Sequence, residues 1–431
     1  MADFLWKKSD VPVDEKIMTF MAGQDVVLDR QLFVYDLQAS AAHVKGLESI
    51  EILSSEDANK LLGALTDLEG KFTSGNFTLD DRFEDGHSAI ESYLTEQLGE
   101  LGKRVHTGRS RNDQVLVATR LLLRDRLEEL HAQCLNTASL CIERARATEN
   151  IPMPGYTHLQ RAVVSSVGMW FAAFAESFID NAQLALDTRN WINANPLGTA
   201  AGFGVNLPLD RELTTRELGF SRMQINPIYA QNSRGKFEVQ ALSAFAQALQ
   251  DVRRFAWDIS LFSTSEFNFV TLPDRFTTGS SIMPNKRNPD LVELLRGAYP
   301  CVEAAIIELQ SLLSLSTGYH RDLQNTKAPL LRGLQQGCAV MELFPDLVGS
   351  LQFNEQALAK AIEPAMHATD RAMELAAAGL PFRDAYRTVM NEMPELAGRD
   401  ASQSLNARVS PGACANLMLD ELSRRLEQLR D

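Results

Sequence analysis

The chain has 431 residues, with 42 Lys and Arg against 56 Asp and Glu, which gives a formal net charge of −14. At about 150 residues per domain, this length is enough for roughly three folded units. Hydrophobic residues make up 45% of the sequence and charged residues 23%, a composition that excludes an intrinsically disordered chain. The acidic balance argues against a nucleic-acid partner, because neutralising phosphates needs an excess of Lys and Arg.

No segment has the composition of a signal peptide or a membrane span. The chain begins MADFLWKK, with an early acid and no apolar run behind it, so we expect no signal peptide. The longest stretch without a charge, residues 190–209, is rich in Asn, Gly and Pro. That composition is typical of a polar loop and not of a bilayer span, so we expect no membrane partner.

The cysteines indicate a reducing compartment. There are five, with no CxxC pair, at positions 134, 141, 301, 338 and 414. Cys134 and Cys141 are seven residues apart in an apolar helical pattern, where small buried thiols are expected. We therefore predict reduced core cysteines in a cytoplasmic protein, in preference to disulfides or a zinc site.

Long segments without Gly or Pro predict long helices. They lie between Gly108 and Pro152, Gly168 and Pro196, Gly235 and Pro273, and Pro300 and Gly318. In the first and third, apolar or small residues recur at steps of three, four and seven, which is one face of a helix. A helix of about 36 residues is on the order of 54 Å long. A helix of that length cannot bury its apolar stripe in a compact monomer, which predicts an oligomeric, all-α bundle.

The distribution of long and short elements predicts three regions. The N-terminal region, 1–108, is mostly helical with turn clusters such as Thr73–Asn76. The central region, 109–350, contains the long helices. The C-terminal region, 351–431, is again short-helical, with a turn at Gly379–Pro381.

The polar segment that precedes the first long helix is a candidate anion site. Residues 103–114 read KRVHTGRSRNDQ, with four Lys or Arg and a His in a strongly acidic chain. The start of a helix with Ser and Asn donors favours a carboxylate or phosphate ligand. A solvated basic loop with a Ser or Asn cap is the alternative. No aromatic residues interleave to stack on bases, which disfavours nucleic acid.

Three further polar segments at helix ends could carry chemistry. Residues 154–161, PGYTHLQR, open onto a predicted apolar helix and present His158 either as an acid or base or as a structural residue. Residues 278–290, TGSSIMPNKRNPD, combine a Gly-Ser end with a cationic end stiffened by two prolines, and offer a proton acceptor and groups for an oxyanion. Residues 319–327, YHRDLQNTK, mean little alone. No GxxxxGK[ST], GxGxxG or HExxH motif is present, and His87 has no second His nearby, so we expect no metal site.

Together these segments resemble a known family. Residues 279–289, GSSIMPNKRNP, resemble the signature loop GSSxMPxKxNP of the fumarase/aspartase superfamily. Within that superfamily, residues 106–114 and 155–162 are similar to those of the argininosuccinate lyases. The spacing of Tyr319, Gln324 and Lys327 is similar too. The likeness covers the chain from about Glu84 to Asp384 and is weaker at both ends.

The resemblance implies a homotetramer in which the central helices of three-domain subunits form a twenty-helix bundle. Each active site would be built from loops of three subunits. It also implies a cofactor-free and metal-free reaction, the reversible β-elimination of argininosuccinate to arginine and fumarate in arginine biosynthesis.

The resemblance also implies roles for individual residues. Ser280 would remove a proton from the carbon beside a succinyl carboxylate, while Lys286 and Asn288 stabilise the doubly charged aci-carboxylate. His158, oriented by Glu293, would protonate the departing guanidino nitrogen directly or through a neighbouring group. The substrate's carboxylates and amino-acid end would be held by Ser110, Arg111, Asn112, Thr157, Gln160, Tyr319, Gln324 and Lys327.

The sequence departs from the family at four places. Residues 5–9 read LWKKS in place of Trp-Gly-Gly-Arg-Phe, and Asp25 stands where family members use a Ser near the substrate. An Asp-Arg-Asp-like run is replaced by SRGK at 233–236, and Val163-Val164 replaces Gln-Pro. Two alternatives follow: a lyase for another fumaryl adduct such as adenylosuccinate, or a non-catalytic, crystallin-like structural protein.

Overall fold

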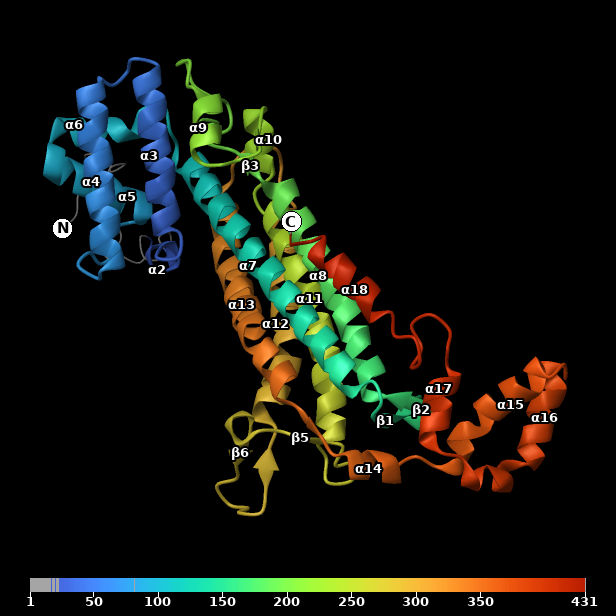
Figure 1. The fold of residues 1–431 in the computed structure, drawn as a ribbon. Coiled ribbons are helices and arrows are strands. Elements are labelled where there is room, and N and C mark those ends of the chain that lie inside the picture. Colours follow the sequence, from blue (N-terminus) through green and yellow to red (C-terminus); the bar gives the residue numbers. More distant parts are fainter. Residues whose placement is uncertain (1–16, 18–19, 21–22, 81, 431) are drawn as a thin grey trace. The chain divides into compact units, whose positions relative to one another are not determined.

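The computed structural model describes residues 17, 20, 23–80 and 82–430. The start of the chain, where we expect no signal peptide and where residues 5–9 depart from the family, lies outside these residues. The described chain is mostly helical (Figure 1), and its strands form only four two-stranded pieces. The prediction of an all-α fold is confirmed.

Five long helices contain most of the regular structure. They are α7 (Arg111–Thr148), α8 (Val167–Ile192), α11 (Lys236–Phe262), α12 (Asp290–Leu312) and α13 (Lys327–Ser350). The longest, α7, has 38 residues, or about 57 Å at 1.5 Å per residue. The first helix that the sequence predicts is therefore confirmed almost in full.

Two of the long helices differ from their predicted bounds. Helix α11 ends at Phe262, well before Pro273, because the polar run 263–266 ends the apolar stripe and its side chains bond to the backbone. Helix α12 begins at Asp290 and continues through Pro300. A proline inside a helix costs about 3 kcal/mol, but Leu295 and Val302 on either side of it are buried, so packing carries the helix past the proline.

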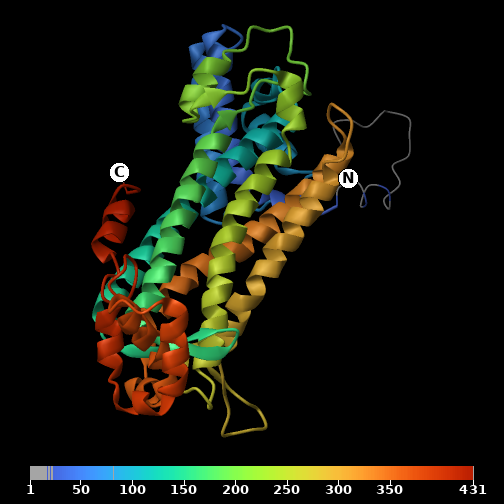
Figure 2. The same cartoon turned by 90° about the vertical axis from the view of Figure 1, so that its right-hand side faces the viewer.

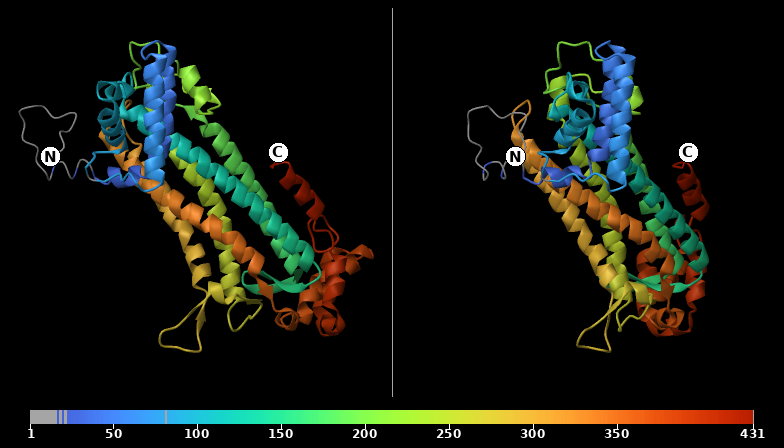
Figure 3. Two further views of the ribbon diagram at one scale, coloured as in Figure 1. Left: turned by 60° about the vertical axis from the view of Figure 1, so that its left-hand side comes forward. Right: turned by 90° about the vertical axis from the view of Figure 1, so that its left-hand side faces the viewer.

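The chain divides into two compact units, and the predicted boundaries at 108 and 350 stay a prediction. Unit 1 comprises residues up to 128, 186–243 and 303–335. In it, α3 (Phe33–Ser49) and α4 (Ser55–Thr73) lie side by side (Figure 3) and pack with α5 (Gly86–Leu98) around buried residues that include Phe33, Leu61 and Ile90. Its shorter elements are α2 (Asp25–Asp29), α3 (Phe33–Ser49), α4 (Ser55–Thr73), α5 (Gly86–Leu98), α6 (Glu100–Lys103), η1 (Arg104–His106), β3 (Ala194–Asn195), α9 (Arg211–Glu217), β4 (Arg222–Met223), α10 (Pro227–Asn232) and η3 (Arg321–Thr326).

Unit 2 comprises residues 129–185, 244–302 and 336–431. Aromatic side chains fill part of its core: Trp170 packs on Phe174 and Phe255, and its Nε1–H donates to Asp258. Its shorter elements are β1 (Pro152–Thr157), β2 (Gln160–Ser166), β5 (Val270–Thr271), η2 (Asp274–Phe276), β6 (Thr278–Gly279), β7 (Arg287–Asn288), β8 (Gln352–Phe353), α14 (Glu355–Lys360), η4 (Pro364–His367), α15 (Ala368–Ala377), α16 (Phe382–Asn391), η5 (Met393–Gly398), α17 (Ala401–Ala407) and α18 (Leu419–Glu427). The predicted turn at Gly379–Pro381 separates α15 from α16.

A β-hairpin is the main element that the sequence analysis missed. Strands β1 and β2 are antiparallel, and their last pair is Thr157 with Gln160. The helix that we expected to follow PGYTHLQR begins only at Val167. The β-branched residues Val163 and Val164, which replace the family's Gln-Pro, favour the strand, and Val164 is fully buried.

No disulfide joins any two of the five cysteines, all of which lie in the described part of the chain, and three of them are buried: Cys134, Cys141 and Cys414. Burial raises the pKa of the Cys134 and Cys141 thiols, as expected for inert core cysteines. The prediction is wrong for Cys301, which is exposed on α12. Among the described residues, no helix combines the length and the apolar character that crossing a membrane requires.

Candidate active site

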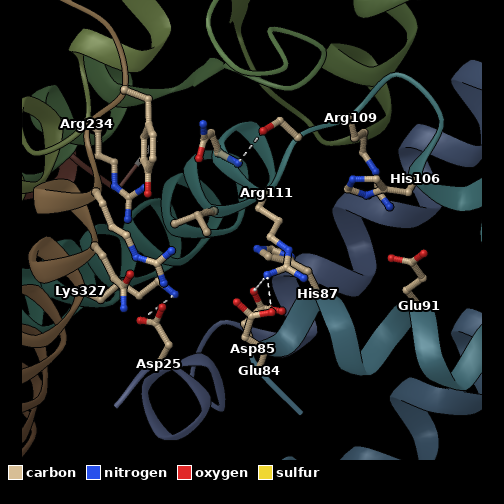
Figure 4. A pocket seen from close by; sticks show the side chains of 16 residues that line it. Asp25, Glu84, Asp85, His87, Glu91, His106, Arg109, Arg111, Arg234 and Lys327 are labelled. Carbon is tan, nitrogen blue, oxygen red and sulfur yellow. Dashed lines mark hydrogen bonds and ion pairs between the residues drawn. The ribbon is translucent and has the colours of Figure 1, made fainter. Parts of the chain in front are cut away.

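A cavity of about 580 Å³ in unit 1 collects charged side chains from segments far apart in the sequence (Figure 4). Its lining includes six of the residues predicted to bind substrate: Ser110, Arg111, Asn112, Tyr319, Gln324 and Lys327. Five fixed cations line the cavity, namely Arg109, Arg111, Arg234, Arg321 and Lys327. Four carboxylates face them, from Asp25, Glu84, Asp85 and Glu91.

The start of α7 is fixed by a buried carboxylate. Asp113 accepts hydrogen bonds from the backbone N–H groups of Ser110 at 2.9 Å, Gly198 at 3.0 Å and Ala200 at 2.9 Å. The Ser110 hydroxyl in turn accepts from the N–H of Asn112 at 3.3 Å. Ser110 and Asn112 therefore take part in capping the start of α7, and the same residues line the cavity. The two interpretations of this segment do not exclude each other.

Arg111 is held over the cavity by two acids. Its Nη1 lies 3.0 Å from Glu84 Oε2 and 3.0 Å from Asp85 Oδ2. Asp85 also caps α5 by accepting from the Ser88 N–H at 2.7 Å. Burial alone would raise the pKa of Asp85, but the nearby His87 and Arg111 lower it below its usual range.

Lys327 is a buried ammonium with two carboxylate neighbours, one of which, Asp25, is drawn in Figure 4. Its Nζ lies 2.7 Å from Asp29 Oδ1 and 3.3 Å from Asp25 Oδ1. The other oxygen of Asp29 accepts from the N–H of Gly86 at 2.9 Å. Burial lowers the pKa of Lys327, but Asp29 and Asp25 outweigh this effect, so the pKa is raised and Lys327 is cationic.

Two histidines beside the cavity have opposite electrostatic environments. Burial and the nearby Arg109 lower the pKa of His106 to about 4, so this ring is neutral at pH 7. Burial also lowers the pKa of His87, but Asp36, which bonds to its Nδ1, reverses the direction and raises it. The buried Nε2 of His87 has no hydrogen-bond partner in the described part of the chain. The sequence analysis treats His87 only as a metal ligand; the neighbouring Asp85 was a sequence signal for its raised pKa, whereas Asp36 comes near only through the fold.

Arg234 also lines the cavity and was missed. Its guanidinium is buried, bonds through Nε to Thr326 Oγ1 at 3.3 Å, and lies over the ring of Tyr319 with a centroid distance of 5.9 Å. Gly235, which follows it, has φ +87°, and a Cβ built there would lie 2.2 Å from Leu313 Cδ2, so a side chain at this position would be strained and would require Leu313 to move. The sequence signal for this cation was an Arg directly before a Gly. The sequence analysis noted the segment 233–236 only as a departure from the family pattern.

Three predicted site residues lie at the tip of the β1–β2 hairpin in unit 2. Thr157, His158 and Gln160 are exposed, and the turn itself is formed by His158 at φ +54° and Leu159 at φ +58°. Non-glycine residues in this left-handed conformation are costly, by about 1 kcal/mol or more each. The hairpin therefore presents the His158 imidazole at a strained, two-residue turn.

The remaining predicted residues lie in and after the 278–288 segment, which extends past the ends of α11 and α12 (Figure 2). The Ser280 Oγ accepts hydrogen bonds from the backbone N–H groups of Ile282 at 3.3 Å and Met283 at 3.0 Å. Lys286 is exposed, and Asn288 belongs to β7. Glu293 lies 3.8 Å from Arg296, and its orientation of His158 stays a prediction. None of these residues lines the unit 1 cavity.

Comparison with known proteins gives the family. A family model described as a lyase matches residues 8–302. Proteins named argininosuccinate lyase from Stenotrophomonas maltophilia (strain R551-3) and Xylella fastidiosa (strain 9a5c) are each 55% identical to the chain. Each match covers 100% of the chain, with 100% and 97% of the two relatives. The chain belongs to the lyase family, and within it to the argininosuccinate lyases.

Solved structures share the fold. A variant of EDDS lyase with bound fumarate has a TM-score of 0.81 at 23% identity, and the match covers 97% of this chain and 92% of that one. A class II fumarase from Schistosoma mansoni has a TM-score of 0.75 at 16% identity, with 97% and 96% covered. The fold is therefore that of the lyases of this superfamily, as the sequence predicted.

Proposed function

We propose that this chain is a cytoplasmic carbon–nitrogen lyase that cleaves argininosuccinate reversibly into arginine and fumarate, in arginine biosynthesis. The observation that carries the proposal is the mixed charge of the unit 1 cavity. Its five fixed cations suit a ligand with several carboxylates, and its four acids suit a ligand that also carries cationic groups. Argininosuccinate has three carboxylates, a guanidinium and an ammonium group.

The surroundings of Ser280 support its role as the base. An ordinary serine is a weak base, so its alkoxide has to be stabilised before it can remove a proton. Hydrogen bonds that favour the charged form of a group lower its pKa, and the Ile282 and Met283 N–H groups already point at Oγ. After proton removal, Lys286 and Asn288 stabilise the aci-carboxylate electrostatically. His158 then protonates the departing nitrogen, and the carbon–nitrogen bond breaks.

The placement of the site residues supports a shared site in a homotetramer. Ser110, Arg111, Asn112, Tyr319, Gln324 and Lys327 line the cavity. The exposed hairpin tip at 157–160 and the exposed loop around Lys286 are available to other copies of the chain. In this proposal, a site is assembled from loops of three subunits, one of which contributes the cavity.

The cavity lining disfavours the two alternatives. The purine of adenylosuccinate needs an apolar or aromatic surface, whereas the lining residues that the structure describes offer only Val115, Tyr319 and two histidine rings among many charged groups. A structural, crystallin-like protein needs no cluster of buried ions, because burying them costs stability. The strained turn at His158 likewise has no use in packing.

A direct assay tests the proposal. Fumarate absorbance is followed with argininosuccinate and adenylosuccinate side by side, at equal enzyme concentration. We expect fumarate from argininosuccinate alone. Reaction with adenylosuccinate alone would show that the substrate assignment is wrong. No fumarate from either substrate would contradict the proposed activity and favour the structural, crystallin-like alternative.

A further inference from the structure

The last helix of the chain, α18, packs beside α8 (Figure 1) as a strap, by which we mean residues 419–430. Leucines at helical spacing form its buried face: Leu419, Leu422 and Leu426. Its polar face pairs with α8, because Arg425 Nη1 lies 2.7 Å from Glu176 Oε1 and Nη2 lies 2.9 Å from Asp180 Oδ1. These side chains are partly exposed, and ion pairs of that kind contribute little to stability. The attachment of the strap therefore depends on its leucines and on the contact at its far end.

That contact is made by a buried histidine. His131 lies on α7 and is 7% exposed. Its Nδ1 lies 2.9 Å from the carbonyl oxygen of Ala182 on α8, and its Nε2 lies 3.1 Å from the carbonyl oxygen of Leu429 in the strap. One imidazole thus joins the end of the strap to two long helices.

Both partners of the ring are carbonyl oxygens, which accept hydrogen bonds and cannot donate them. A neutral imidazole has a single N–H, so in either tautomer one ring nitrogen presents its lone pair to a carbonyl oxygen. An imidazolium has two N–H groups and can donate to Ala182 and Leu429 at once. Because a buried polar group without a partner is costly, protonation of His131 completes this contact.

We propose that His131 is a proton-operated clasp for the C-terminal strap: when the ring binds a proton, the strap is held more tightly to α7 and α8, and when the ring loses the proton, the strap is released more readily. The Leu429 oxygen is beside the ring only while the strap is docked, so docking and protonation favour each other. The attachment therefore strengthens as the pH falls through the range in which the ring takes up its proton, and weakens as the pH rises.

The other charged groups on the packed elements do not titrate between about pH 6 and pH 8, because they are carboxylates and guanidiniums. They are Glu128, which pairs with Arg189, and Glu129 on α7; Glu176 and Asp180 on α8, with Arg425; Glu427, which pairs with Arg430, in the strap; and Asp251 on α11, which accepts from the Asn181 amide. The Cys134 thiol, one turn after His131, is kept neutral by burial, which raises its pKa. A response of the strap in this pH interval therefore belongs to His131.

The experiment is hydrogen–deuterium exchange of the full-length protein, followed by mass spectrometry at about pH 6 and about pH 8, with exchange times scaled for the intrinsic effect of pH. Peptides from 419–430 report the strap, and peptides from α12 report the stability of the rest of the unit. One hydrogen bond from a charged donor predicts that the strap is at least about fivefold better protected at the lower pH. Protection that is equal at the two pH values, or greater at the higher one, overturns the proposal, and this comparison needs no variant to fold. A change of the same size in α12 also overturns it.

The variant His131→Gln separates the clasp from ordinary packing. A glutamine amide can donate to one of the two carbonyl oxygens and does not bind a proton, so we expect the strap's response to pH to fall below about twofold. His367→Gln is the matched control: His367 is buried in the same unit, but its Nδ1 lies 2.7 Å from the Ser404 hydroxyl, which can donate or accept and so satisfies a neutral ring. This control should keep the wild-type response. A wild-type response in His131→Gln, or an equal loss in both variants, overturns the proposal.

Discussion

The hydroxyl oxygen of Ser280 lies 3.0 Å from the backbone nitrogen of Met283 and accepts its hydrogen bond. This contact orients the oxygen and favours its ionised form, so in our proposal removing the hydroxyl removes the base. We expect Ser280→Ala to reduce kcat by at least about 10²-fold, the size of a general-base contribution. The residue is partly exposed in a loop, so thermal unfolding should be unchanged. Near-normal turnover would exclude Ser280 from the mechanism.

The shared site predicts that two inactive variants restore each other. Ser280→Ala removes the proposed base from the 278–288 loop, and Arg111→Met removes a cation from the cavity. In our proposal, the loop and the cavity of one active site come from different subunits. If the two variants are co-expressed and their copies mix at random, about a quarter of the active sites should contain both an intact loop and an intact cavity. The measurement is specific activity of the purified mixture against each variant alone. Activity that never exceeds the two separate variants would contradict sites shared between copies.

Gly235 positions Arg234 through its backbone. Its φ of +87° is strained for any residue with a side chain, and a Cβ built there would lie 2.2 Å from Leu313 Cδ2 and would require Leu313 to move. We expect Gly235→Ala to destabilise the protein by more than about 1 kcal/mol and to raise the KM for argininosuccinate. Gly63→Ala is the matched control, because Gly63 lies within α4 with nothing inside 4 Å, and the helix propensity of Ala should increase stability by about 0.5–1 kcal/mol. Urea unfolding of both variants checks the sign of each change.

Asp113 is the buried acceptor for three backbone N–H groups. An asparagine at this position offers one acceptor oxygen, and its NH2 group would face a backbone N–H, so that two donors would face each other. We therefore expect Asp113→Asn to reduce the free energy of unfolding by about 1–3 kcal/mol. Asp210→Asn is the control, since Asp210 caps α9 through the Leu213 N–H at 2.8 Å and Asn caps a helix about as well as Asp. Equal stability of the two variants would show that the Asp113 contacts contribute little.

Neutral histidines predict a loss of stability in acid. Burial and Arg109 lower the pKa of His43 well below 6.5, and the same causes lower that of His106 to about 4. The unfolded chain binds these protons at about pH 6.5 and the folded chain only at lower pH, so stability falls as the pH falls from about 6.5 toward 4. His87, with its raised pKa, acts in the opposite direction.

The variant His43→Gln isolates this contribution. The His43 Nε2 lies 2.9 Å from the Thr107 carbonyl oxygen, and a glutamine amide can donate to the same oxygen without binding a proton. We expect the Tm of this variant, followed by circular dichroism, to fall less steeply than that of the wild type between pH 6.5 and 4. Parallel curves for the two proteins would show that His43 does not take part in the acid response.

The sequence predicted the helices because their signal is local. The absence of Gly and Pro and the spacing of apolar residues specify α7 almost to its ends. The hairpin at 152–166 was missed because its strands are short and adjoin a helix, so their alternation is weak against the helical pattern. The course of α12 through Pro300 depends on packing, which no local signal contains.

The site was predictable where a segment carries its own motif, and less so where distant residues meet. Ser110, Arg111 and Lys327 were predicted and do line one cavity. Asp25 and Arg234 join them only because the fold brings three distant segments together. Their charges could be read in the sequence, but their pairing with Lys327 and Tyr319 could not.

The hairpin that ends in His158 has a further consequence for which sequence changes it can accept. Its two strands are joined by two residues between the pair Thr157 and Gln160, and successive side chains on a ribbon face opposite sides. Lengthening or shortening the tip by one residue would replace the two-residue turn that orients the imidazole by a turn of another type, whatever residues were used. Point substitution at Leu159 leaves that geometry in place, so loop length, more than loop composition, is what this part of the enzyme has to preserve.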